Sequence, residues 1–126
     1  MVKNNVAALV LCLCGCASYV STVPPKTDEP HAVLEVERRD NRPIVKVSEI
    51  RAQFASGGID IPYEQVQPER IYLSPGFYIV EADCLLPGSV IWLDYKPYYG
   101  FSVLAGKVYI LACDVNANLG IKVYEK

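Results

Sequence analysis

Apolar and polar residues alternate along most of the chain after residue 30. In residues 31–38 (HAVLEVER), alanine, leucine and valine side chains share one face and two glutamates lie on the other. A period of two predicts a strand that buries one face. The turn-forming residues 40–43 (DNRP) then lead into an apolar run at residues 44–47. We therefore predict a β-hairpin over residues 31–47.

Two more segments predict hairpins of the same kind. Residues 70–84 (RIYLSPGFYIVEADC) contain two alternating runs on either side of Ser74-Pro75-Gly76. Proline at the second place and glycine at the third fit a type II turn, in which glycine takes a positive φ. Residues 101–114 repeat the arrangement around Ala105-Gly106-Lys107.

The rest of the folded region adds shorter elements. Residues 51–68 contain Gly57-Gly58 and two prolines, so we expect a long connection with a short strand at 59–61. Alternating residues predict further strands at 89–95 and 119–124. Because no helical period interrupts this pattern, we predict an all-β domain at residues 31–126. Its expected form is a single antiparallel β-sandwich of about seven or eight short strands.

The N-terminus has a different pattern. Lys3 is the only charge in residues 1–5, and residues 6–13 are uninterruptedly apolar. A charged region followed by a short apolar region is typical of an export signal. The apolar run has about half of the 20 or so residues that a membrane span needs. A buried helix is the other alternative, but it would need neither the preceding lysine nor the proline-rich segment that follows.

Leu13-Cys14-Gly15-Cys16 ends this apolar segment and resembles the signal of bacterial lipoproteins. That signal has a branched apolar residue, a small residue directly before the cysteine, and a cysteine that receives a diacylglycerol. The resemblance implies that residues 1–15 are removed and that Cys16 becomes the lipid attachment site, with palmitate among its acyl chains. Ala17 replaces the aspartate that commonly retains lipoproteins in the inner membrane. The implied localisation is the cell envelope, lipid-anchored in the outer membrane and facing the periplasm.

Residues 16–30 are predicted to form the lipidated N-terminus and an extended tether. Residues 18–30 (SYVSTVPPKTDEP) contain three prolines and no apolar periodicity, as linkers do. At about 3.1 Å per residue, such a tether would reach roughly 40 Å. We expect the folded part to begin near His31.

Charge and composition exclude some function classes. The chain has a net charge of −2, one unit more negative once Lys3 is lost with the signal, and the arginines at 38, 39 and 42 alternate with polar residues in a predicted turn. A nucleic-acid partner is therefore not expected. With one histidine and no glycine-rich phosphate loop, the sequence offers no catalytic constellation. Carboxylates are present, but no spacing selects a pair, so we expect no enzyme and no cofactor.

Cys84 and Cys113 are the two cysteines left after signal removal and acylation. In an oxidising compartment they predict a disulfide. The bond would close a loop of 29 residues, for which chain entropy predicts about 3 to 4 kcal/mol of stabilisation. The alternative is a pair of buried free thiols. No metal site is expected, because His31 and two thiolates are one ligand short of a structural zinc centre.

Residues 92–101 (WLDYKPYYGF) are the densest aromatic run in the chain. Tyrosine and tryptophan anchor many interfaces because they combine large rigid area with a polar tip, and their rings also stack on sugars. The candidate binding surface is Tyr95, Lys96, Tyr98 and Tyr99. The alternative is that these rings complete the core.

Residues 71–80 contain a strand, Pro75-Gly76 and Tyr78. They resemble the "L-x-P-G-x-Y-x-V" hairpin of PEGA-type and related transthyretin-like β-sandwich modules of bacterial lipoproteins. The resemblance implies an envelope-exposed binding or spacer module without catalytic activity. We expect an interaction module for an envelope protein or a cell-wall glycan. The alternative is a structural or assembly subunit of an envelope complex, such as a secretion apparatus.

Overall fold

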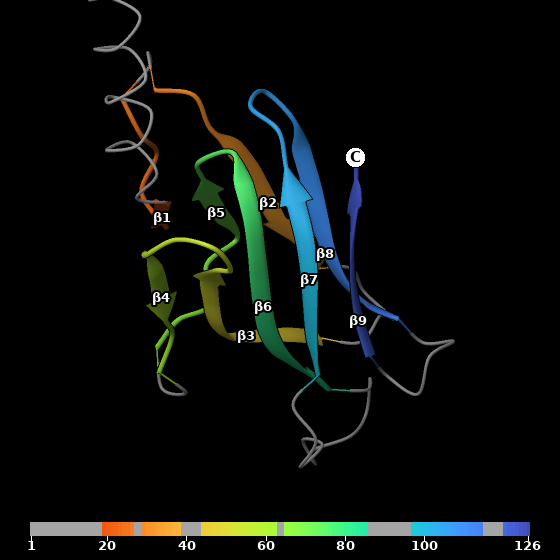
Figure 1. Ribbon diagram of the computed structural model, residues 1–126. Helices are drawn as coiled ribbons and strands as arrows, with labels where there is room; N and C mark the ends of the chain where they lie inside the picture. Colours follow the sequence, from red (N-terminus) through yellow and green to blue (C-terminus); the bar gives the residue numbers. More distant parts are fainter. Residues whose placement is uncertain (1–18, 27–28, 39–43, 63–64, 86–96, 115–119) are drawn as a thin grey trace, which may run out of the picture.

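The computed structural model describes residues 19–26, 29–38, 44–62, 65–85, 97–114 and 120–126. These residues form nine strands and no helix, and the strands make two sheets that face each other (Figure 1). The first sheet has the order β1 (Val20–Ser21), β5 (Arg70–Leu73), β2 (Ala32–Val36), β8 (Val108–Asp114), β9 (Gly120–Glu125). The second has the order β4 (Gly58–Asp60), β3 (Ile44–Ala52), β6 (Gly76–Leu85), β7 (Tyr98–Val103). The predicted all-β sandwich is confirmed.

None of the three predicted hairpins forms. β2 and β3, β5 and β6, and β7 and β8 lie in opposite sheets, so each connection carries the chain from one sheet to the other. Gly76, with φ 152°, and Gly106, with φ 79°, stand at two of these crossings. The value at Gly76 is far from the φ of about 80° that a type II turn requires. The turn residues were correctly located, but they reverse the chain between sheets.

The pairing is antiparallel throughout the described strands except between β2 and β8, which are parallel. Backbone hydrogen bonds hold the starts of these two strands together. The Val33 amide donates to the Lys107 carbonyl at 3.1 Å, and the Gly106 amide donates to the His31 carbonyl at 2.9 Å. The connection between β7 and β8 thus places β8 beside β2, with both strands running in the same direction.

β3 runs five residues past the predicted end of its strand. Val45 and Val47 are buried, and so are Ile50 and Ala52, so the inward positions change phase between Val47 and Ile50. The register with β6 shifts between Val47 and Glu49. A bulge of this kind adds one residue to a strand and restores its inward face. It explains why the alternation is lost at this point in the sequence.

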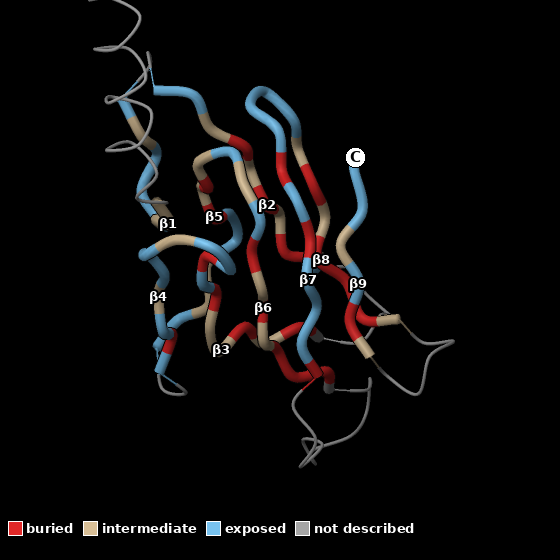
Figure 2. Tube along the Cα trace, viewed as in Figure 1, coloured by how far each residue is buried: buried red, intermediate tan, exposed pale blue. Residues whose placement is uncertain are grey.

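The core fills the space between the two sheets. Buried residues alternate with less buried ones along β2 and β5 (Figure 2), whereas β6 and β8 each contain three successive buried residues near their C-terminal ends. Tyr78, Leu34 and Ile50 are among its largest fully buried side chains. Cys84 of β6 and Cys113 of β8 are joined, with 2.06 Å between the sulfur atoms. The predicted disulfide therefore links the two sheets.

The segment predicted as a tether is partly folded. Val20 and Ser21 form β1 and pair with Leu73 and Tyr72 of β5. Tyr19 is bound at the end of this pair, because its amide donates to Ser74 Oγ at 2.9 Å and its carbonyl accepts from the Ser74 amide at 3.0 Å. The domain thus begins at least twelve residues before the expected start. A strand of two residues is too short for an alternation of apolar and polar residues to be recognised in the sequence.

Two of the shorter predicted strands are present in the structure. The short strand predicted at 59–61 corresponds to β4, and the one predicted at 119–124 corresponds to β9. The strand predicted at 89–95, the signal peptide and Cys16 lie outside the described residues. In the described part of the chain, no helix is long and apolar enough to cross a membrane.

The sandwich has two distinct ends. At the first, which we call the turn end, lie the crossings at 74–76 and 104–107, the segment 53–57 and the C-terminus (Figure 1). At the second, the loop end, lie the disulfide and the strand ends that lead into residues 39–43, 86–96 and 115–119. Tyr19 enters at the turn end, beside Ser74.

Candidate functional site

Tyr98 and Tyr99 begin β7 but do not form one surface. Successive side chains of a strand point to opposite faces. Tyr98 is 72% exposed on the outer face of its sheet, whereas Tyr99 is 36% exposed and occupies the same side as the buried Phe101. Both rings are exposed but point to opposite faces of β7, and their shared role in binding stays a prediction. Tyr95 and Lys96, the other members of the predicted surface, lie outside the described residues.

Tyr98 belongs to a row of polar residues across three strands. Glu81 of β6 is the register partner of Tyr98, and Glu49 of β3 is the partner of Glu81. A second row runs beside the first and contains Arg51, Ile79 and Gly100. Five of these six residues line a shallow hollow of about 310 Å³: Glu49, Arg51, Ile79, Glu81 and Tyr98. We call this surface the Tyr98 hollow.

Gly100 leaves space beside the Tyr98 ring because it has no side chain. A Cβ added at Gly100 would come no closer than 4.0 Å to its nearest neighbour, the Tyr78 carbonyl oxygen. Neither packing nor a positive φ requires glycine at this position. The missing side chain leaves Ile79 uncovered next to Tyr98, so a flat group could lie against both.

The two glutamates of the Tyr98 hollow repel each other. Glu49 and Glu81 stand directly opposite each other, and like charges in that position destabilise a sheet. Arg51 offsets part of this repulsion, with Nη1 3.7 Å from Glu49 Oε1, but its side chain is 61% exposed. A ligand that brings hydroxyl donors or a positive charge would satisfy these carboxylates. The hollow therefore combines an aromatic face with hydrogen-bond acceptors.

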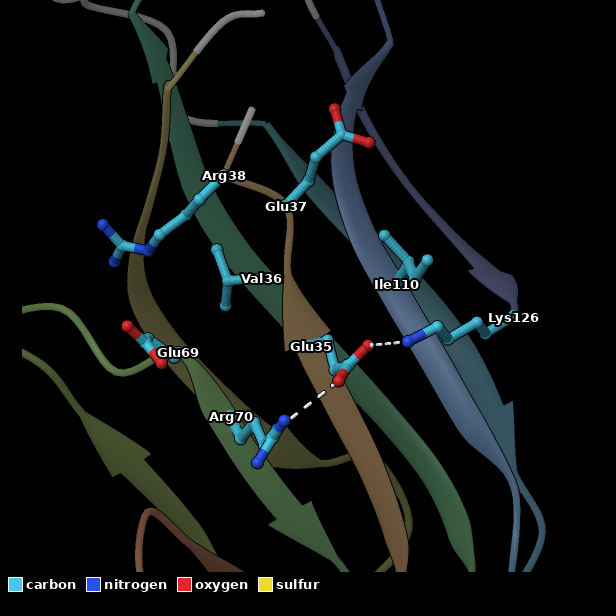
Figure 3. A pocket seen from close by; sticks show the side chains of 8 residues that line it. All are labelled: Glu35, Val36, Glu37, Arg38, Glu69, Arg70, Ile110 and Lys126. Carbon is cyan, nitrogen blue, oxygen red and sulfur yellow. Dashed lines mark hydrogen bonds and ion pairs between the residues drawn. The ribbon is translucent and has the colours of Figure 1, made fainter. Parts of the chain in front are cut away.

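A second hollow, of about 330 Å³, lies on the outer face of the other sheet (Figure 3). Glu35 stands at its centre and is held from both sides. Lys126 Nζ donates to Glu35 Oε1 at 2.9 Å, and Arg70 Nε donates to Glu35 Oε2 at 3.4 Å. The hydrogen bond from Lys126, followed by the charge of Lys126 and the contact with Arg70, lowers the pKa of Glu35 below its ordinary value of 4.5. Both carboxylate oxygens are already engaged in ion pairs, which link β2 to β5 and to the C-terminal residue.

Most residues of the Tyr98 hollow could not be predicted from the sequence. Glu81 entered only as one of many carboxylates, and Glu49, Arg51, Ile79 and Gly100 did not stand out. Their contribution depends on the registers of β3 with β6 and of β6 with β7. The one signal along the chain is the alternation in residues 79–81 and 98–100, which places Ile79, Glu81, Tyr98 and Gly100 on outward positions.

In the described ranges, no group of three or more histidine, cysteine or acidic residues is placed to hold a metal ion. No protein-family model, curated protein or solved structure matches the chain. The chemistry of the Tyr98 hollow therefore carries the functional assignment.

Proposed function

We propose that this protein is a lipid-anchored envelope lipoprotein whose domain is a non-catalytic interaction module. Cys16 carries the lipid anchor, and the Tyr98 hollow binds a cell-wall glycan or an envelope protein. The observation that carries the binding role is the exposed Tyr98 ring next to Ile79, Glu49 and Glu81. The lipobox-like Leu13-Cys14-Gly15-Cys16 supports the anchor.

The chemistry of the hollow suits both kinds of ligand. Sugars combine an apolar ring face with several hydroxyl donors, which match a tyrosine ring and two carboxylates. Proteins use tyrosine as an interface anchor because it buries large area and loses little entropy. A lysine or arginine of a partner would bind between Glu49 and Glu81. The hollow also lies away from Tyr19, so an anchor at Cys16 leaves it accessible.

The binding role is tested with Tyr98→Ala in the full-length acylated protein. Its matched control is Tyr124→Ala, which removes another exposed tyrosine from the opposite sheet. Binding to purified peptidoglycan is measured by co-sedimentation, and binding to envelope proteins by cross-linking in whole cells. We expect Tyr98→Ala to weaken one of the two by about 30-fold, as loss of an aromatic anchor typically costs about 2 kcal/mol. The control should bind as the unchanged protein does.

Each outcome has a defined meaning. Loss of sedimentation identifies the glycan, and loss of a cross-link identifies a protein partner. If Tyr98→Ala retains both, the Tyr98 hollow is not the binding site. Co-purification of one stoichiometric membrane complex that survives Tyr98→Ala would select the alternative, a structural or assembly subunit.

The anchor is tested separately by Cys16→Ser. This variant should remain unprocessed and incorporate no labelled palmitate, because it lacks the sulfur that forms the thioether. The unchanged protein should incorporate label and partition into detergent. Continued labelling of Cys16→Ser would place the lipid on another cysteine.

A further inference from the structure

The turn end of the sandwich exposes an apolar ridge. Phe54, in the segment after β3, is 77% exposed, and Phe77 of β6 is 53% exposed. Their rings meet edge to face, with 5.6 Å between centroids. Leu104, 64% exposed, follows β7 two positions beyond Ser102, the register partner of Phe77. We call Phe54, Phe77 and Leu104 the apolar ridge.

The ridge has no role in the core. Phe77 points outward while the next residue, Tyr78, is fully buried, and Ser102 and Leu104 alternate with the buried Phe101 and Val103. Exposed apolar side chains that cluster mark interaction surfaces more often than those that occur singly. The ridge is separate from the Tyr98 hollow, which lies further along β6 and β7 towards the loop end.

The entry point of the chain lies close to the ridge. The Tyr19 carbonyl accepts a hydrogen bond from the Ser74 amide at 3.0 Å, and the Tyr78 hydroxyl oxygen lies 3.5 Å from this carbonyl oxygen. Ser74 is three residues from Phe77, a stretch that spans at most about 11 Å. Residue 19 is therefore fixed at the same end of the domain as the ridge.

The length of chain before this point limits the distance from Cys16. Two residues separate Cys16 from Tyr19, and the three Cα–Cα steps between these positions span at most about 11 Å in any conformation. A lipid on Cys16 would therefore hold Tyr19, at the turn end, within about 11 Å of the bilayer surface. A domain held so closely must present this end to the lipid headgroups.

We propose that the apolar ridge of Phe54, Phe77 and Leu104 docks onto the bilayer that holds the lipid anchor. This inference rests on the proposed acylation of Cys16. Phenylalanine and leucine are typical of the apolar faces that bind at the headgroup boundary. Docking fixes the orientation of the sandwich, so that the loop end and the Tyr98 hollow face away from the membrane.

The test uses full-length acylated protein in vesicles of phosphatidylethanolamine and phosphatidylglycerol with brominated acyl chains. Phe54→Trp, combined with Trp92→Phe, places the only indole on the ridge. Val66→Trp in the same background is the matched control, because Val66 is an exposed apolar residue beyond the far end of β5. Bromine quenches only nearby indoles. We expect the quenching of Phe54→Trp to exceed that of Val66→Trp by about threefold or more.

Hydrogen exchange of the unsubstituted protein provides a second measurement that needs no new side chain. Comparison of acylated protein on vesicles with unacylated protein starting at residue 17 in solution should show slower exchange on the vesicles in segments 53–57 and 104–107. Segment 65–67 should exchange at the same rate in both. Equal quenching at the two tryptophans, or equal exchange in all three segments, would overturn the docking.

Failure of the anchor is distinguishable from failure of the docking. If the unsubstituted protein neither carries lipid nor floats with vesicles, the proposed acylation of Cys16 is wrong. The docking proposal, which depends on this acylation, is then wrong as well. If the protein floats with vesicles but Phe54→Trp is quenched no more than Val66→Trp, only the docking is wrong.

Discussion

The turn end and the loop end of the sandwich hold the two sheets together by different means. At the turn end, two short crossings join the sheets, and Tyr19, Ser74 and Tyr78 form a hydrogen-bonded cluster. At the loop end, the described contact that joins the sheets covalently is the Cys84–Cys113 disulfide. Short connections limit how far two strands can separate, whereas long ones do not. The covalent bond thus stands where the backbone supplies the least constraint.

The largest effect is expected from removal of the disulfide. The double change Cys84→Ala and Cys113→Ala should lower stability by about 3 kcal/mol, because the unfolded chain regains the entropy of a 29-residue loop. In the unacylated protein starting at residue 17, the double change should lower the melting temperature by roughly 10 to 20 °C.

A thiol titration provides the control. The protein without acylation, denatured but not reduced and starting at residue 17, should contain no free thiol. Two titratable thiols would contradict the bond, and an unchanged melting temperature would show that the loop end does not depend on it.

A smaller effect is expected at the turn end from Tyr78→Phe. The Tyr78 hydroxyl donates to the Ser74 carbonyl at 2.6 Å and lies 2.8 Å from Ser74 Oγ. The change keeps the buried ring and removes only the hydroxyl, so stability should fall by about 1 to 2 kcal/mol. Tyr109→Phe is the matched control, because it removes a single hydrogen bond, from the Leu104 amide to the Tyr109 hydroxyl at 2.9 Å. If Tyr78→Phe costs no more than this control in a urea titration, the cluster does not act as a unit.

The smallest effect concerns Glu35, which lies between the two ends on the outer face of its sheet. Its lowered pKa means that its contribution to stability is present above pH 4.5 and is lost as the pH falls below this value. Both partners are more than half exposed, so the contribution should stay below about 1 kcal/mol. Glu35→Gln should lower the urea midpoint at pH 7 and have no effect at pH 2. Equal effects at the two pH values would show that the charge is irrelevant.

Much of the fold follows from local patterns in the sequence. Alternation at residues 32–36 predicts which side chains are buried, and Ala32, Leu34 and Val36 are indeed inward. The Cys84–Cys113 pair follows from elimination of the other cysteines. These features are predictable because each depends on a short segment or on a count. The proposed anchor at Cys16 likewise depends only on a short motif and remains a prediction.

The sheet assignments could be decided only by the tertiary structure. A strand with one buried face has the same alternation whether its neighbour in sequence pairs beside it or lies opposite it across the core. Ser74-Pro75-Gly76 therefore predicts that the chain reverses at this point. It does not predict whether the next strand pairs in the same sheet or lies in the opposite sheet. Likewise, Tyr19 belongs to the domain only because a partner 55 residues away binds its amide.

The candidate surfaces depend on the same long-range choices. The aromatic run at 92–101 pointed to Tyr98 but also to Tyr99, which alternation places on the other side of β7. Glu49, Glu81 and Tyr98 form a row only because the Ser48 bulge and two strand registers align them. Patterns along the chain were enough to predict most of the described strands, their buried faces and the cysteine pair, since these depend on neighbours in sequence. Which strands meet and which exposed residues share a surface became known from the folded domain alone, because these depend on how distant segments pack around one core.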